Sequence, residues 1–78
     1  MIENELKKET EKWLERIKKI GFKSASEKGK WMKENIEAYV NDCEYFLKIN
    51  DLIRAFECVI WAWAFVEIGK ELGELEVE

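Results

Sequence analysis

The side chains that enzymes most often use for acid–base chemistry are scarce in this sequence. It contains no histidine, which is the commonest general base and a frequent metal ligand. The carboxylates of Asp42 and Glu57 could approach each other, but a magnesium site made only of carboxylates usually also needs substrate phosphates. We expect these carboxylates to pair with Arg54 and with backbone amides instead. The sequence therefore predicts a protein that is not an enzyme and has no catalytic residues, metal or cofactor.

The two cysteines, Cys43 and Cys58, are the only thiols in the sequence. If a helical hairpin turns between residues 50 and 51, the two cysteines lie level with each other on antiparallel helices. One interpretation is a packed pair of reduced thiols that act as small apolar side chains. A disulfide is the alternative if the Cα atoms come within about 7 Å. Two thiols without further ligands would make a poor zinc site.

A cluster of basic side chains is the clearest hint of ligand binding. Residues 16–33 contain seven lysines and arginines but a single acid, Glu27, and two aromatic residues are interleaved with them. Lysines beside an exposed aromatic ring can hold a phosphate backbone and stack a base. The candidate anion or nucleic-acid patch consists of Arg16, Lys19, Lys23, Lys28, Lys30 and Trp31. The alternative is a solvated helix end with ordinary solubilising lysines.

The composition limits the fold that must position these groups. A chain of 78 residues that is 47% hydrophobic and 38% charged can form one small domain with a real core. The absence of proline favours helices over a turn-rich β fold. The net charge of −4 is uneven, because residues 1–34 hold ten bases and seven acids, whereas residues 35–78 hold three bases and ten acids.

The apolar segments are too short for a membrane protein. The longest unbroken apolar run covers residues 58–66, whereas a bilayer requires roughly 20 residues. The first residues also lack a basic segment followed by an apolar run, so we expect no signal peptide. We therefore expect a cytoplasmic protein with no membrane partner.

Hydrophobic periodicity predicts three helices, over residues 3–20, 27–48 and 51–72. Ser24 followed by Glu27 fits a capping box for the second helix, and Asp51 is the expected cap of the third, with Arg54 as its ion-pair partner. We expect residues 74–78 to form a frayed acidic tail.

The apolar stripe of the first helix consists of Ile2, Leu6, Trp13, Ile17 and Ile20. Short connectors make neighbouring helices antiparallel, so residues 1–78 are predicted to form one all-α domain, an up-and-down three-helix bundle with short connectors.

The third predicted helix carries apolar residues on two opposite sides. One side can face the rest of the bundle, but two neighbouring helices cover little more than half of a helix circumference. Part of the second side should then stay exposed in a monomer, and an exposed apolar patch marks an interaction surface. The alternative is that the first predicted helix crosses the third and covers this second apolar side. We predict an interface with a second copy in a homodimer, or with another protein, at Trp61, Phe65, Ile68 and Leu72.

The predicted hairpin contains Ala38-Tyr39, Asp42, Tyr45-Phe46-Leu47, Asp51, Arg54-Ala55-Phe56-Glu57-Cys58 and Trp61-Ala62-Trp63. In these residues it resembles an archaeal family of unknown function, domain-of-unknown-function family 357. Asn50 stands where we expect glycine, and Trp61 where tyrosine is commoner. The resemblance covers about half of the chain. It implies a compact three-helix bundle and an archaeal cytoplasmic source, and it implies no activity.

Two classes of function remain after these considerations. The sequence favours a non-enzymatic protein-interaction or assembly module, without naming its partner. The alternative is a nucleic-acid or nucleotide-binding adaptor that uses the basic connector around residues 16–33. The two classes differ in one simple property, because binding through phosphate contacts is released by salt.

Overall fold

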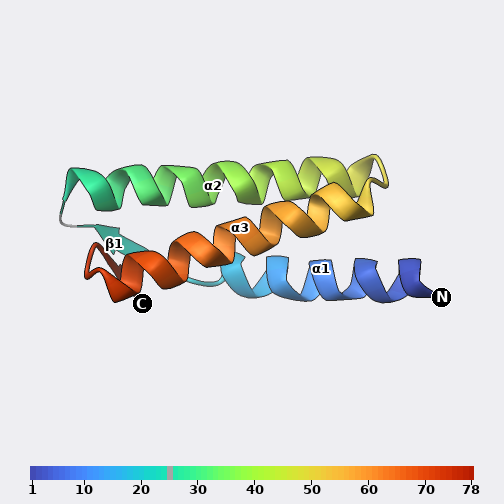
Figure 1. The fold of residues 1–78 in the computed structure, drawn as a ribbon, viewed down its shortest axis with the longest axis horizontal. Helices are drawn as coiled ribbons and strands as arrows, with labels where there is room; N and C mark the ends of the chain where they lie inside the picture. Colours follow the sequence, from blue (N-terminus) through green and yellow to red (C-terminus); the bar gives the residue numbers. More distant parts are fainter. Residues whose placement is uncertain (25) are drawn as a thin grey trace.

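The computed structural model describes residues 1–24 and 26–78. It contains three helices, α1 (Ile2–Lys18), α2 (Glu27–Lys48) and α3 (Leu52–Glu71), and two short strands, β1 (Phe22–Ser24) and β2 (Leu75–Val77). The helices run up, down and up along a molecule of 43 × 17 × 17 Å (Figure 1). The predicted three-helix bundle is therefore confirmed, and a small sheet is added at one end of it. Within the two described ranges, no helix combines the length and the apolarity needed to cross a bilayer.

Helix α3 lies between the other two helices and packs against both, whereas α1 and α2 barely contact each other (Figure 1). This arrangement follows from the sequence, because α3 is the most apolar helix and α1 has only a narrow apolar stripe. The core is formed by Leu14, Ile17, Met32, Ile36, Cys43, Ala55, Val59, Ala62, Val66 and Leu75.

The residues through which α1 contacts α3 lie closer to the C-terminal end of α1 than the sequence suggested. Ile2 was expected on the apolar stripe but is 79% exposed, while Thr10 is fully buried. Thr10 tolerates burial because its hydroxyl donates a hydrogen bond to the carbonyl oxygen of Leu6, at 2.8 Å. The helix also ends at Lys18, two residues before the predicted end at Ile20. The expected range of 3–20 was therefore wrong at its C-terminal end.

The start of α2 agrees with the predicted residue Glu27, but its cap is Ser26 and not Ser24. The Ser26 hydroxyl accepts a hydrogen bond from the backbone N–H of Gly29 at 3.0 Å and donates one to the carboxylate of Glu74. Ser24 belongs to β1 instead. The predicted capping box was therefore wrong, because the chain is still extended at Ser24 and turns into the helix two residues later.

The expectation of a frayed acidic tail over residues 74–78 was also wrong. Strand β2 pairs antiparallel with β1, with Phe22 opposite Val77 and Ser24 opposite Leu75. Leu75 is 4% exposed, and the backbone N–H of Glu78 donates to the carbonyl oxygen of Gly21 at 2.8 Å. The tail alternates acidic and apolar residues, and this period of two places Leu75 and Val77 on the core side of a strand.

The loop between α2 and α3 explains why Asn50 can stand where we expected glycine. Asn50 has a φ of 60°, which is the left-handed conformation that glycine adopts without cost. Asparagine is among the few other residues that enter this region readily. Gly73, directly after the C-cap of α3, has a φ of 72°, the left-handed conformation in which glycine commonly ends a helix.

Candidate functional site

Four aromatic side chains form a continuous row along the contact between α2 and α3. The ring of Phe65 lies 5.7 Å from Trp31, at a steep angle, and 5.9 Å from Tyr39. Tyr39 in turn stacks on Trp61, with ring centroids 6.5 Å apart. These spacings are those of favourable aromatic pairs. The row ends in two indoles, Trp31 and Trp61, that are each exposed by more than half.

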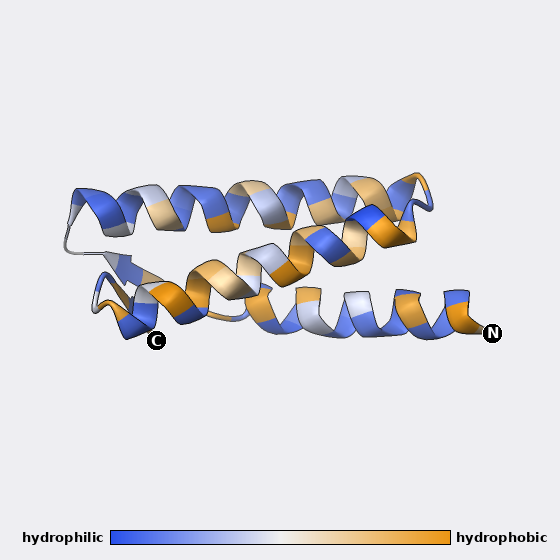
Figure 2. Ribbon diagram, in the orientation of Figure 1, coloured by the Kyte–Doolittle hydropathy of each residue, from blue (hydrophilic) through white to orange (hydrophobic). Residues whose placement is uncertain are grey.

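Helix α3 exposes a set of large apolar side chains on the side that neither α1 nor α2 covers. We call this set the outer face of α3. It consists of Ile53, Ile60, Trp61, Ile68 and Leu72, which are 45–69% exposed. Figure 2 shows apolar colour on most turns of α3, whereas α1 and α2 alternate between hydrophilic and hydrophobic bands. A helix that is apolar all round is normally buried all round, so the outer face of α3 is the strongest candidate site in this molecule.

The structure places the predicted interface residues in two different environments. Trp61, Ile68 and Leu72 are exposed on the outer face of α3. Phe65 is partly buried between Trp31 and Tyr39, so it contributes to the packing of α2 on α3. Sequence reasoning missed Ile53 and Ile60, because they lie on neither of the two stripes that it considered.

The predicted anion or nucleic-acid patch lies beside the acidic strand β2. Lys23 lies opposite Glu76 in the sheet, and its amino group is 3.4 Å from a carboxylate oxygen of Glu78. Elsewhere in the patch, the guanidinium of Arg16 stacks 4.8 Å from the ring centroid of Trp13. Lys19, Lys28 and Lys30 are exposed. Glu27 is therefore not the sole acid near this connector.

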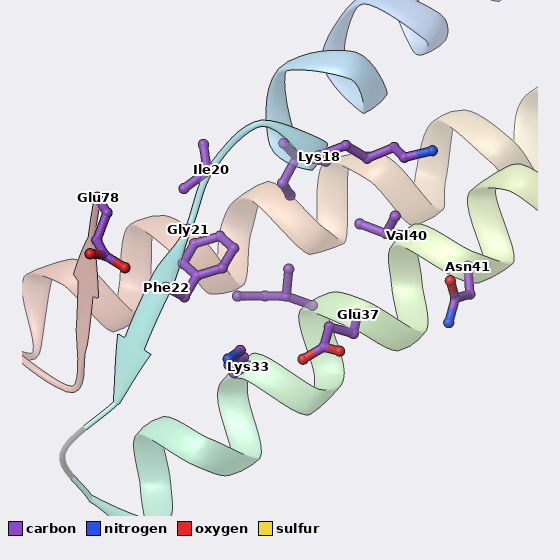
Figure 3. Close-up of a pocket in the computed structure, with 11 residues that line it drawn as sticks. Lys18, Ile20, Gly21, Phe22, Lys33, Glu37, Val40, Asn41 and Glu78 are labelled. Atoms are coloured by element: carbon purple, nitrogen blue, oxygen red, sulfur yellow. The ribbon is translucent and has the colours of Figure 1, made fainter.

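A shallow groove of about 490 Å³ lies where the end of α1 and strand β1 meet α2 (Figure 3). Its lining is mixed, with apolar side chains such as Phe22 and Val40 and a rim that carries the opposite charges of Lys33 and Glu37. Over residues 1–24 and 26–78, no group of three or more metal-ligating side chains comes together. The groove offers charge pairs and apolar contact but no nucleophile beside a base.

Asp51 and Arg54 have the geometry predicted for a helix cap with an ion pair. The Asp51 carboxylate accepts a hydrogen bond from the backbone N–H of Arg54 at 3.2 Å and a second from its guanidinium at 2.6 Å. The hydrogen bond from the Arg54 side chain, followed by that from its backbone, lowers the pKa of the Asp51 carboxyl group. The ionised form is thus the one that the folded state favours.

We predict that Asp51→Ala lowers the melting temperature by about 4–8 °C at neutral pH, because the start of α3 loses its cap. The lowered pKa means that this contribution is present above the ordinary carboxyl pKa and disappears as the pH falls through the folded-state value. Thermal unfolding followed by circular dichroism at pH 7 and at strongly acidic pH measures both effects. An equal shift at the two pH values would contradict the ionic contribution.

Cys43 and Cys58 are both free thiols and lie on facing helices. Cys43 is fully buried, and burial raises its pKa to about 11, with a smaller contribution from Cys58. Cys58 is partly exposed, and burial again is the main cause of its raised pKa. The interpretation of two packed, reduced thiols agrees with this geometry.

We predict that iodoacetamide at pH 8 modifies Cys58 slowly and Cys43 only after unfolding, because the thiolate is the reactive form. Mass spectrometry of the peptides, with and without denaturant, distinguishes the two positions. Rapid modification of Cys43 in the native protein would show that the α2–α3 interface opens.

Two comparisons with known proteins agree with this architecture. The sequence profile of the family described as "Protein of unknown function (DUF357)" matches residues 6–75. The crystal structure of protein AF1782 from the archaeon Archaeoglobus fulgidus, which is assigned to the same family, is similar with a TM-score of 0.83. Its sequence is 50% identical, and the alignment covers 97% of each chain. No curated protein matches the chain significantly.

Proposed function

The chain belongs to the DUF357 family of proteins of unknown function, and we propose that it is a non-enzymatic interaction or assembly module whose contact surface is the outer face of α3. The observation that carries the proposal is the exposure of four large apolar side chains on α3 and of a fifth, Leu72, directly after it. Leaving such a surface in water is unfavourable by about 25 cal/mol for each Å². A protein partner that covers the surface recovers this free energy.

The aromatic row supports the same proposal. Trp61 is shared by the outer face of α3 and by the row that runs to Trp31, so a partner could contact both α3 and α2. Tryptophan is enriched among residues that dominate binding energy, because its large ring is rigid and apolar. The free thiols of Cys43 and Cys58 fit a reducing compartment, and we propose the cytoplasm as the location.

Site-specific photo-cross-linking tests the proposal. A photo-reactive phenylalanine analogue at position 61 should form a discrete adduct with a protein in an extract of the native cells. The same analogue at position 45, where Tyr45 is equally exposed on α2, serves as the control. Excess unlabelled wild-type chain should abolish the adduct, whereas excess Trp61→Glu chain should not. Equal adducts from both positions, or none from position 61, would contradict the proposal.

The nucleic-acid adaptor makes a different prediction about heparin. In that case the lysines of residues 16–33 would retain the protein on heparin at low salt and release it by about 0.3 M salt. We expect no retention, because the carboxylates of β2 lie beside Lys23 and the net charge is −4. Salt-sensitive retention that Lys28→Glu and Lys30→Glu remove together would favour the adaptor.

A further inference from the structure

We infer that the partner of the outer face of α3 is a basic amphipathic helix of another protein, whose lysines or arginines face the carboxylates of Glu57, Glu67 and Glu71. This inference rests on the proposed function, because it names the chemistry of the partner at the same face. Two properties of the face carry it: the arrangement of its charges and the helical backbone beneath it.

Three exposed glutamates lie among the apolar side chains of the outer face. Successive residues of a helix are about 100° apart, so Glu57 lies about 40° from Trp61 around α3. By the same geometry, Glu67 and Glu71 lie about 20° to either side of Ile60. A partner that covers the apolar side chains therefore also meets these carboxylates.

The basic residues of α3 do not balance this acidic charge. Helix α3 contains two of them, Arg54 and Lys70. The guanidinium of Arg54 already pairs with the carboxylate of Asp51, at 2.6 Å. Lys70 lies about 160° from Ile68, on nearly the opposite side of the helix. The outer face of α3 is therefore net acidic, and a basic partner complements it. A second copy of this chain, or a nucleic acid, would instead bring more negative charge to the face.

The backbone of α3 favours a helical partner over an extended one. Its N–H and C=O groups bond within the helix, so the outer face presents side chains and no strand edge to pair with. A segment that is buried against such a surface must satisfy its own backbone groups, and a helix does this internally. Its apolar residues would then recur every three or four positions, as in other helices that bind apolar surfaces.

A shallow cleft of about 720 Å³ extends the apolar surface past the start of α3. Its lining includes Ile2 and Leu6 of α1, Ile49 of the loop that precedes α3, and Ile53. Ile53 belongs both to this cleft and to the outer face of α3. A helix of about five turns can therefore find apolar contacts along the whole of α3.

Fluorescence anisotropy of the full chain with two labelled 18-residue peptides tests this inference. Both peptides carry leucines at helical spacing and are largely unfolded when free, and the flanking positions are lysine in one and glutamate in the other. We expect the lysine peptide to bind at least about tenfold more tightly at low salt, to lose most of this advantage in 1 M salt, and to become helical by circular dichroism on binding. Equal affinities, no binding of the lysine peptide, or binding without a gain of helix would overturn the inference.

A charge exchange locates the contact. Glu57→Lys combined with Glu71→Lys should reverse the preference, so that the glutamate peptide binds more tightly. Glu15→Lys combined with Glu34→Lys is the matched control, because it changes the net charge equally at exposed positions of α1 and α2. The control should keep the preference for lysine. A reversal by the control as well would show that net charge, and not the outer face, selects the peptide, and would overturn the inference.

A neutral substitution tests the apolar part of the contact. Trp61→Gln should weaken binding of the lysine peptide by about tenfold, whereas Tyr45→Gln, at an equally exposed position of α2, should not. Ile68→Gln replaces Trp61→Gln if that variant does not fold by circular dichroism. Equal effects at positions 61 and 45 would contradict binding at the outer face. If the peptides fail while the cross-linking experiment still gives a discrete adduct at position 61, the inference is overturned and the proposed function stands.

Discussion

Replacing Gly29 by alanine is expected to destabilise the protein by about 2 kcal/mol and to detach strand β2 from α2. A Cβ atom at position 29 would overlap the backbone carbonyl oxygen of Glu74 and would lie 2.9 Å from the Cβ atom of Ser24. Ser24 is paired with Leu75 in the sheet, and Glu74 directly precedes β2, so the clash is relieved only if the strand moves. Helix propensity alone predicts the opposite sign, because alanine is favoured over glycine by about 1 kcal/mol inside a helix.

Urea denaturation gives the change in the free energy of unfolding, and amide hydrogen exchange of residues 75–77 reports the strand. Gly21→Ala is the matched control, because a Cβ atom there meets only the side chain of Glu78, at 3.3 Å, which can rotate away. A Gly29→Ala variant that is more stable than the wild type would show that β2 does not hold the start of α2. Gly69→Ala should resemble Gly29→Ala, since its Cβ atom would lie 2.5 Å from the buried Leu75 side chain.

The helices could be predicted from the sequence because their signals are local. The range 27–48 for α2 matches the structure, and the start of α3 was set by Asp51 through a contact with Arg54 three residues away. Each of these signals spans only a turn or two of helix.

The small sheet could not be predicted in the same way. Each strand is only three residues long, and the pairing joins Phe22 to Val77 across almost the whole chain. Three residues are too few for a period of two to be distinguished from chance. The role of Gly29 could not be predicted for the same reason. Its neighbour Glu74 is distant in sequence, so the close approach of the two backbones is not visible in the residues around Gly29.

The candidate site was predicted in part. The second apolar side of α3 was visible from its periodicity, and three of its four predicted residues are exposed. The burial of Phe65 was not visible, because it depends on Trp31 and Tyr39 of a different helix. This difference changes the choice of variants. A charge at position 65 would disturb the packing of α2 on α3, whereas charges at positions 61 and 68 test the exposed face.

Trp63→Ala is expected to destabilise the protein by about 3 kcal/mol, because Trp63 joins α1 to the rest of the bundle. Its ring packs edge-on against Trp13 with centroids 5.6 Å apart, and its indole N–H donates to the Trp13 carbonyl oxygen at 3.1 Å. Truncation removes a large apolar side chain together with a hydrogen bond across the seam. Since α1 makes few contacts with α2, its position depends mainly on its contact with α3.

Trp61→Ala is the matched control, because the same side chain is removed two residues away on the exposed side of the same helix. Urea denaturation should show a change of about 1 kcal/mol or less for this variant, because the main loss is the stacking of Trp61 on Tyr39. Equal destabilisation by the two substitutions would mean that Trp61 belongs to the core of the single chain. A large effect of Trp63→Ala beside a small effect of Trp61→Ala would show that Trp63 holds α1 on the bundle, whereas Trp61 belongs to the exposed contact surface.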